Sequence, residues 1–408
     1  MKRPGFTLVE ILVATTLALL ILGAVITVFG NMTQSIAESR SMLETAEQLR
    51  LTATRLQQDL GGITVTMNPP RKPENNEGYF EYIEGPATTA SAIAKNTDGT
   101  AVVNDTTAGD FDDILMFTTR STGRPFVGKC GAGNTTQSDV AEVAWFLRGR
   151  TLHRRVLLVR PSVDLSVVAA PYYANCDISA RIQGGNVVPN TLGDLTRREC
   201  RFAHDSANPL QAWGWYWTVN GFSNQHPTLP TLMECSSTGW TVNKTPVNLG
   251  TALTNLDFWT NNSSYRESES VLGTGGTRVA DDVILNNVIG FDVKAWDPDA
   301  RAYVDLGNGG GAYRFSGLGG PNSALAAPNT NYARVYDTYS TSHFYANGAN
   351  GLDDDTNGVV DDNGEKTGTD RAPPYPCPLR GVQVKIRVFE PDSKQVREVT
   401  VVQDFLPQ

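Results

Sequence analysis

The chain has 408 residues and a formal net charge of −9, from 34 Lys or Arg against 43 Asp or Glu. This acidic balance argues against nucleic acid as the main partner, because neutralising phosphates requires clustered Lys and Arg. The length allows two or three domains and a sizeable core, and 38 Gly, 22 Pro and only 19% charged residues agree with an exported protein.

The first 30 residues organise the chain. A basic leader with Lys2 and Arg3 precedes Gly5 and an apolar run whose one charged residue is Glu10. As a helix, residues 6–29 would extend roughly 36 Å, enough to cross a bilayer core of about 30 Å. A cleaved secretory signal should have a shorter apolar region. A plain membrane anchor leaves Glu10 unexplained, because an acid near a membrane segment is costly without a partner.

Residues 5–10, with the sequence Gly-Phe-Thr-Leu-Val-Glu, resemble the N-terminal signature of type IV prepilins and type II secretion pseudopilins. The resemblance implies that a prepilin peptidase cuts between Gly5 and Phe6 and methylates the new terminal amine of Phe6. It also implies that Glu10 acts in assembly, and a neighbouring subunit's terminal ammonium would supply the cation that a carboxylate in an apolar bundle needs. Major pilins often have a helix-kinking proline where this chain has Thr27, so we expect a straighter helix.

The helical pattern continues through residues 31–62, and Gly61-Gly62 is predicted to end it. The whole helix, from Phe6 to Leu60, would be roughly 80 Å long, with its first half in the membrane or filament core and its second half against a globular domain. An unrelated membrane helix followed by a coiled-coil stalk is the alternative. Apolar side chains spaced alternately by four and three residues share one face of the second half: Met42, Ala46, Leu49, Ala53, Leu56 and Leu60.

Residues 63–408 are predicted to form a β-rich head. The fold class is therefore α+β, with a long N-terminal helix packed on an antiparallel β-sheet that carries long loop insertions. Residues 64–110 are predicted to be loop-rich. Strand patterns then occupy residues 113–119, 140–147 and 151–159, with a turn at 148–150.

Two similar hairpins are predicted near the end of the chain. Each combines an alternating strand, an acid-Pro-Asp turn and a return strand, and the proline and aspartate favour the turn. We expect the hairpins to be neighbours in one antiparallel sheet. They cover residues 288–306 and 384–404, and the stretches 160–280 and 307–380 are interpreted as insertions.

Two groups of side chains in the head have competing interpretations. His153, Arg154 and Arg155 could contact phosphate or DNA, but without interleaved aromatic residues a solvated strand face is favoured. A second group of alternating aromatic residues shares one face of a strand, where a packed core or subunit contact is favoured over an adhesive surface. That group is Trp213, Trp215 and Trp217.

Five cysteines are spread along the head. None forms a CxxC pair, which argues against a zinc ribbon or a thioredoxin-like site. In an oxidising compartment we expect one or two disulfides and at least one remaining thiol. The spacing leaves the pairing open. The cysteines are Cys130, Cys176, Cys200, Cys235 and Cys377.

Residues 353–365 contain the one constellation with metal-site chemistry. Hard oxygen ligands in this pattern suit Ca²⁺ better than Mg²⁺, and Gly358 stands where a calcium loop turns sharply. The twelfth position is Gly364, so the Glu of an EF-hand is absent there, and Asp362 or Glu365 would complete the shell. A solvated acidic turn is the alternative. The predicted ligands are Asp353, Asp355, Asn357, the carbonyl of Val359, Asp361 and Glu365.

The sequence favours a non-enzymatic protein. GxSxG, HExxH and phosphate-binding glycine motifs are absent from the sequence, and the four histidines stand in unlike contexts. The order of helix, early strands and late hairpins is similar to that of PilW-type minor pilins and GspJ-type minor pseudopilins.

This resemblance implies a structural subunit of a type IV pilus or a type II secretion pseudopilus, positioned at or near the filament tip. Its partners would be the prepilin peptidase, other major and minor pilins or pseudopilins, and the inner-membrane assembly platform. It would cross the inner membrane once, with its head in the periplasm, before entering the filament. A membrane-anchored surface adhesin or binding module is the alternative.

Overall fold

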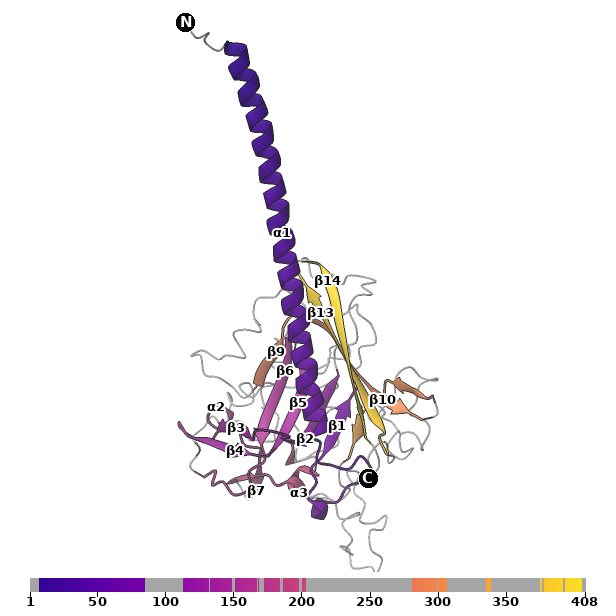
Figure 1. The fold of residues 1–408 in the computed structure, drawn as a ribbon. Helices are drawn as coiled ribbons and strands as arrows, with labels where there is room; N and C mark the ends of the chain where they lie inside the picture. Colours follow the sequence, from indigo (N-terminus) through magenta and orange to yellow (C-terminus); the bar gives the residue numbers. More distant parts are fainter. Residues whose placement is uncertain are drawn as a thin grey trace, which may run out of the picture.

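The computed structural model describes residues 7–84, 113–131, 133–148, 151–166, 168, 172–183, 186–197, 200–202, 281–298, 300–306, 335–338, 375, 378–391 and 393–405. These residues form one long helix that projects from a head made of antiparallel sheets (Figure 1). The α+β class is therefore confirmed. The three tryptophans at 213–217 and the predicted metal loop at 353–365 lie outside the described residues.

Helix α1 (Leu8–Gly61) is 54 residues long, as the apolar run and the heptad-like spacing predict. Thr7 caps its N-terminus, and Gly62 follows its last turn. Position 62 requires glycine because the backbone of Arg120 lies close to it, and a Cβ there would meet the Arg120 carbonyl oxygen at 2.2 Å. The helix therefore ends where the chain must pass against the edge of the head.

The larger sheet has six antiparallel strands in the order β12-β1-β2-β5-β6-β9. The strand predictions near residues 113–159 are confirmed, but the predicted loop zone at 64–110 also contains strand β1 and the short helix η1 (Pro73–Asn75). The strands are β1 (Phe80–Ile83), β2 (Ile114–Arg120), β5 (Val140–Arg148), β6 (Thr151–Leu158), β9 (Asp281–Leu285) and β12 (Val335–Asp337).

The two C-terminal hairpins form a second sheet in the order β11-β10-β13-β14, so their predicted adjacency is confirmed. The head thus has two main sheets where the sequence predicted one. Because the hairpin strands alternate between buried and more exposed positions, this sheet has a single core face. Its strands are β10 (Val288–Asp297), β11 (Ala302–Val304), β13 (Gly381–Glu390) and β14 (Gln395–Asp404).

The described residues of the predicted insertion at 160–280 cover the outer face of the larger sheet. Side chains such as Leu165, Ile178 and Phe202 pack there against Ile114 and Phe146 from the sheet. The larger sheet is consequently buried on both faces. The additional elements are β3 (Phe126–Lys129), β4 (Thr135–Ser138), α2 (Tyr172–Asn175), β7 (Ala180–Gln183), β8 (Asn186–Pro189) and α3 (Leu192–Leu195).

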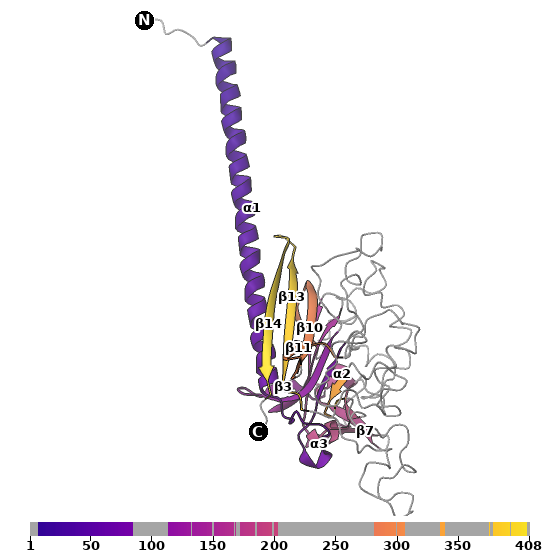
Figure 2. The same ribbon diagram turned by 90° about the vertical axis from the view of Figure 1, so that its right-hand side faces the viewer.

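The second half of α1 packs against both sheets and runs beside β13 and β14 (Figure 2). Leu49, Leu56 and Leu60 are buried in the main core. Burying each leucine contributes about 2 kcal/mol to this docking. The remaining members of the predicted apolar face, Met42, Ala46 and Ala53, are half-buried, and the charged side chains around them are exposed.

The structure predicts that the projecting half of α1 is dispensable for folding of the head. A chain without residues 1–33 should appear in the soluble fraction and melt within about 2 °C of the full-length chain in detergent, because contacts with the head begin near Glu38. A chain without residues 1–5 is the control and should stay in the membrane fraction. Aggregation of the shorter chain, or its retention in membranes, would contradict the expectation.

Candidate functional site

The projecting half of α1 is a continuous exposed apolar surface. From Leu8 to Ala37 the only charged residue is Glu10, and every described side chain in this span is exposed. Soluble monomers rarely expose apolar patches larger than a few hundred Å². The helix is long and apolar enough to cross a membrane. The exposed large side chains include Leu12, Leu19, Leu20, Ile21, Ile26, Phe29 and Ile36.

The threonine hydroxyls in this surface are satisfied within the helix. Thr16 donates to the carbonyl of Leu12 at 2.8 Å, and Thr27 donates to the carbonyl of Gly23 at 2.9 Å. Thr15 and Thr33 make equivalent bonds to earlier carbonyls. Because each of these threonine hydroxyls has a partner on its own helix, the threonines can enter lipid or another apolar environment without an unpaired donor.

Glu10 closes the N-terminus of α1 through a capping box with Thr7. The Glu10 carboxylate accepts hydrogen bonds from the backbone N–H and the hydroxyl of Thr7, both at 2.9 Å, and the Thr7 hydroxyl accepts from the Glu10 N–H at 3.3 Å. The helix thus gives Glu10 a local role besides the predicted role in assembly. Gly5 and Phe6, the predicted processing residues, lie outside the described part of the chain.

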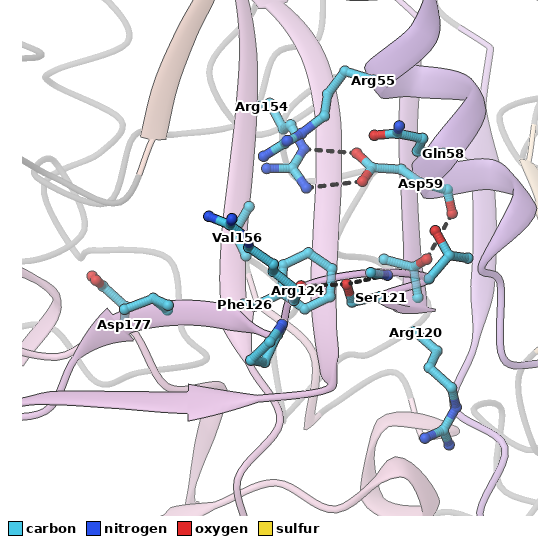
Figure 3. A pocket seen from close by; sticks show the side chains of 15 residues that line it. Arg55, Gln58, Asp59, Arg120, Ser121, Arg124, Phe126, Arg154, Val156 and Asp177 are labelled. Carbon is cyan, nitrogen blue, oxygen red and sulfur yellow. Dashed lines mark hydrogen bonds and ion pairs between the residues drawn. The ribbon is translucent and has the colours of Figure 1, made fainter.

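The opposite end of α1 is fixed to the larger sheet by Asp59. Its carboxylate accepts from Arg154 Nε at 2.7 Å and from a terminal nitrogen of the same guanidinium at 2.8 Å (Figure 3). It also accepts from Trp145 Nε1 at 2.9 Å. Trp145 and Arg154 are direct partners across β5 and β6, so the sheet presents both donors side by side. The Thr119 hydroxyl also donates to the Asp59 carbonyl at 2.7 Å.

The interpretation of residues 153–155 as a solvated strand face is wrong. His153, Arg154 and Arg155 are all buried. Strand β6 is an interior strand between β5 and β9, with α1 over one face and residues such as Ile178, Leu195 and Phe202 over the other. Neither face of such a strand is open to water, so polar residues there need partners within the protein.

Each of the three side chains contacts another buried group of the protein. Arg154 is paired with Asp59. The Arg155 guanidinium lies 3.8 Å from the centroid of the Phe202 ring, a cation–π contact. The His153 ring stacks on Phe146 with centroids 5.5 Å apart. The basic run therefore stabilises the head from inside and is closed to phosphate.

A third buried arginine joins the outer layer to the edge of the larger sheet. Glu81 and Asp337 are opposed across β1 and β12, where like charges destabilise a sheet. Arg201 lies between them, and one of its terminal nitrogens donates to Glu81 at 2.9 Å and to Asp337 at 3.0 Å. All three side chains are buried. The described part of the insertion is thus tied to the strands that it covers.

A hollow of about 460 Å³ lies beside the Asp59–Arg154 pair at the end of α1 (Figure 3). Arg55, Arg120 and Arg124 line it and are exposed, and none of them has an ion-pair partner among the described residues. Its positive charge contrasts with the net charge of −9 for the whole chain. The hollow suits a carboxylate or phosphate group, and no histidine or cysteine stands among the lining residues.

The remaining predicted site residues are not brought together in the described part of the chain. The predicted calcium ligands, Asp353 to Glu365, lie outside it. Among described residues, no group of three or more His, Cys, Asp or Glu could hold a metal ion. Cys130, Cys176 and Cys200 are thiols.

Sequence reasoning missed Asp59 and its partners. A signal was present, because Asp59 is three residues after Leu56 and one before Leu60, on the face that packs against the head. An acid on the buried stripe of an amphipathic helix requires a buried donor, and the basic run in β6 supplies it.

Comparison with protein-family models, with curated proteins and with solved structures found no match for this chain.

Replacing Asp59 by Ala should destabilise the full-length chain by about 3–5 kcal/mol, because Arg154 would remain buried without its carboxylate. Urea unfolding in detergent, followed by tryptophan fluorescence, measures this change. Gln58→Ala is the matched control, since Gln58 is the residue before Asp59 in the same helical turn and its side chain is exposed. Equal stability of the two variants would show that the pair does not anchor the helix.

Proposed function

We propose that this protein is a minor pilin or minor pseudopilin, a non-enzymatic structural subunit of a type IV pilus or a type II secretion pseudopilus. The observation that carries the proposal is the projecting half of α1, an exposed apolar helix with one acid near its start. The signature at residues 5–10 and the α+β head support the same function.

In this proposal the projecting helix exchanges one apolar environment for another. Lipid of the inner membrane covers it first, with the head in the periplasm. After prepilin peptidase cuts between Gly5 and Phe6, the assembly platform moves the subunit into the filament, where helices of other pilins cover the same side chains. Because lipid and a helix bundle are similarly apolar, the transfer costs little hydrophobic free energy. The bulky head is easiest to place at or near the filament tip.

Glu10 is proposed to guide this transfer. In the free subunit its carboxylate is held by Thr7. In the filament core, the methylated terminal ammonium of a neighbouring Phe6 would offer a full positive charge, and at low dielectric a carboxylate is attracted more strongly to a full opposite charge than to the neutral donors of a capping box. Exchange of Thr7 for the neighbour's ammonium would then favour addition of the subunit.

Two substitutions separate the capping role of Glu10 from its proposed role in assembly. Glu10→Gln removes the charge and keeps a capping residue, whereas Thr7→Ala removes the cap and keeps the charge. We expect Glu10→Gln to reduce the subunit in sheared filaments at least tenfold, with normal amounts in membranes. We expect Thr7→Ala to assemble within about twofold of the wild type.

The control is Glu47→Gln, which removes an exposed charge from the second half of α1 and should assemble normally. Immunoblots of filament and membrane fractions provide the measurement. Normal assembly of Glu10→Gln would contradict the charge mechanism. If both Glu10→Gln and Thr7→Ala were depleted from filaments to the same extent, Glu10 would be assigned to helix capping alone.

Calcium binding by residues 353–365 is the second part of the proposal, and it rests on the oxygen ligands in the sequence. Bound Ca²⁺ would offset repulsion among the carboxylates of the loop and order it. We expect Ca²⁺ at millimolar concentration to raise the Tm of the full-length chain in detergent and a chelator to reverse the change. The double variant Asp353→Asn/Asp355→Asn should lose the response. A Tm that ignores both calcium and chelator would contradict the proposal.

The two machines differ in the consequences of deletion. Loss of twitching or of DNA uptake would assign the subunit to a type IV pilus, whereas periplasmic accumulation of secreted proteins would assign it to type II secretion. The alternative function, a membrane-anchored adhesin, predicts that the chain lacking residues 1–33 binds glycans or surfaces by itself.

A further inference from the structure

Two of the cysteines face each other in the head. Cys130 follows β3 and Cys176 follows α2, and they are partners in an isolated antiparallel bridge. The hydrogen bonds of this bridge flank the pair. The Gly131 N–H donates to the Asn175 carbonyl at 2.9 Å, and the Asp177 N–H donates to the Lys129 carbonyl at 3.0 Å. Cys130 and Cys176 therefore form a non-hydrogen-bonded pair, the arrangement in which opposite side chains lie closest.

We infer that Cys130 and Cys176 form a disulfide when the head reaches an oxidising compartment. In a non-hydrogen-bonded antiparallel pair the Cα atoms are about 4.5 Å apart, which lies within the range of about 4.4–6.8 Å that disulfides span. The sequence left the pairing of the five cysteines open, and the register of this bridge selects one pair. The inference rests on the exported location that is part of the proposed function.

The disulfide joins the β3–β4 hairpin to the layer that covers the larger sheet. The segment after Cys176 is held on its other side by β6, through a parallel bridge between Ile178 and Leu158. On the hairpin side, the Asp177 carboxylate accepts from the Lys129 N–H at 2.7 Å. A covalent bond at Cys130 therefore fixes the hairpin, which supplies Phe126 to the wall of the hollow, onto the sheet.

The exposure of the two thiols sets the order of reaction. Cys130 is half-buried and Cys176 is buried. Burial also raises the pKa of the Cys176 thiol to about 11, so Cys176 forms little of the nucleophilic thiolate near neutral pH. Cys130 is consequently the residue that an external oxidant meets first.

The oxidant is a disulfide-donor protein of the oxidising compartment. The Cys130 thiolate attacks one sulfur of the donor's disulfide, which forms a mixed disulfide and releases the donor's other sulfur as a thiolate. Cys176 then loses its proton and attacks the Cys130 sulfur, which releases the donor. The two thiols give up two electrons and two protons in total, and the donor's disulfide takes them up to become a dithiol.

Trypsin provides a direct test, because cleavage after Lys and Arg places each cysteine in a different peptide. The full-length chain is purified in detergent under reducing conditions, oxidised with glutathione disulfide, alkylated and digested without reductant. We expect residues 130–148 linked to residues 156–181. Alkylated thiols in both peptides, or a link from either peptide to another cysteine, would overturn the inference.

Stability gives an independent readout. Oxidation should raise the Tm by about 5 °C or more in the wild type and in Cys200→Ser, because the bond closes a long loop in the unfolded chain. It should leave the Tm of Cys130→Ser unchanged. An equal rise in Cys130→Ser would overturn the inference.

The thiol state of protein recovered from cells tests the location separately. A linked pair in cells supports both the disulfide and the exported head. A pair that links with glutathione disulfide in vitro but is reduced in cells supports the pairing and contradicts the exported location. Failure of the two claims is therefore distinguishable.

Discussion

The apolar half of α1 has to be covered by something other than its own head. Roughly 45 Å of helix projects from the sheets with its leucine, isoleucine and valine side chains exposed. Such a surface is costly in water at about 25 cal/mol per Å². Lipid or the helices of other subunits can both cover it, and the satisfied threonine hydroxyls make it compatible with either. The proposed function meets this constraint.

The Asp59 ion pair makes the projecting helix a rigid extension of the head. A buried carboxylate with three donors from two neighbouring strands fixes both the position and the rotation of the last turns of α1. The leucines before it supply most of the apolar burial, but apolar contacts alone would tolerate sliding along the sheet. Directional bonds at Asp59 remove that freedom. A force on the helix is therefore transmitted to the core of the head.

Local patterns in the sequence predicted the elements whose signal is local. The spacing from Met42 to Leu60 identified the packed face of α1, and the acid-Pro-Asp turns identified both C-terminal hairpins. Strands β1, β9 and β12 were missed, because each is short and is held by partners far away in the sequence. The same cause explains the error at Arg154 and Arg155. Their burial depends on α1 and on residues 172–202, and neither contact can be read from the strand itself.

The mass of the N-terminal peptide tests the central claim most directly. The protein would be recovered from membranes of cells with and without their prepilin peptidase. We expect a methylated Phe6 at the N-terminus, and retention of Met1 when the peptidase is absent. An N-terminus at Met1 in both strains, or a cut after the apolar run, would contradict the filament function and favour a plain anchor or a secreted protein.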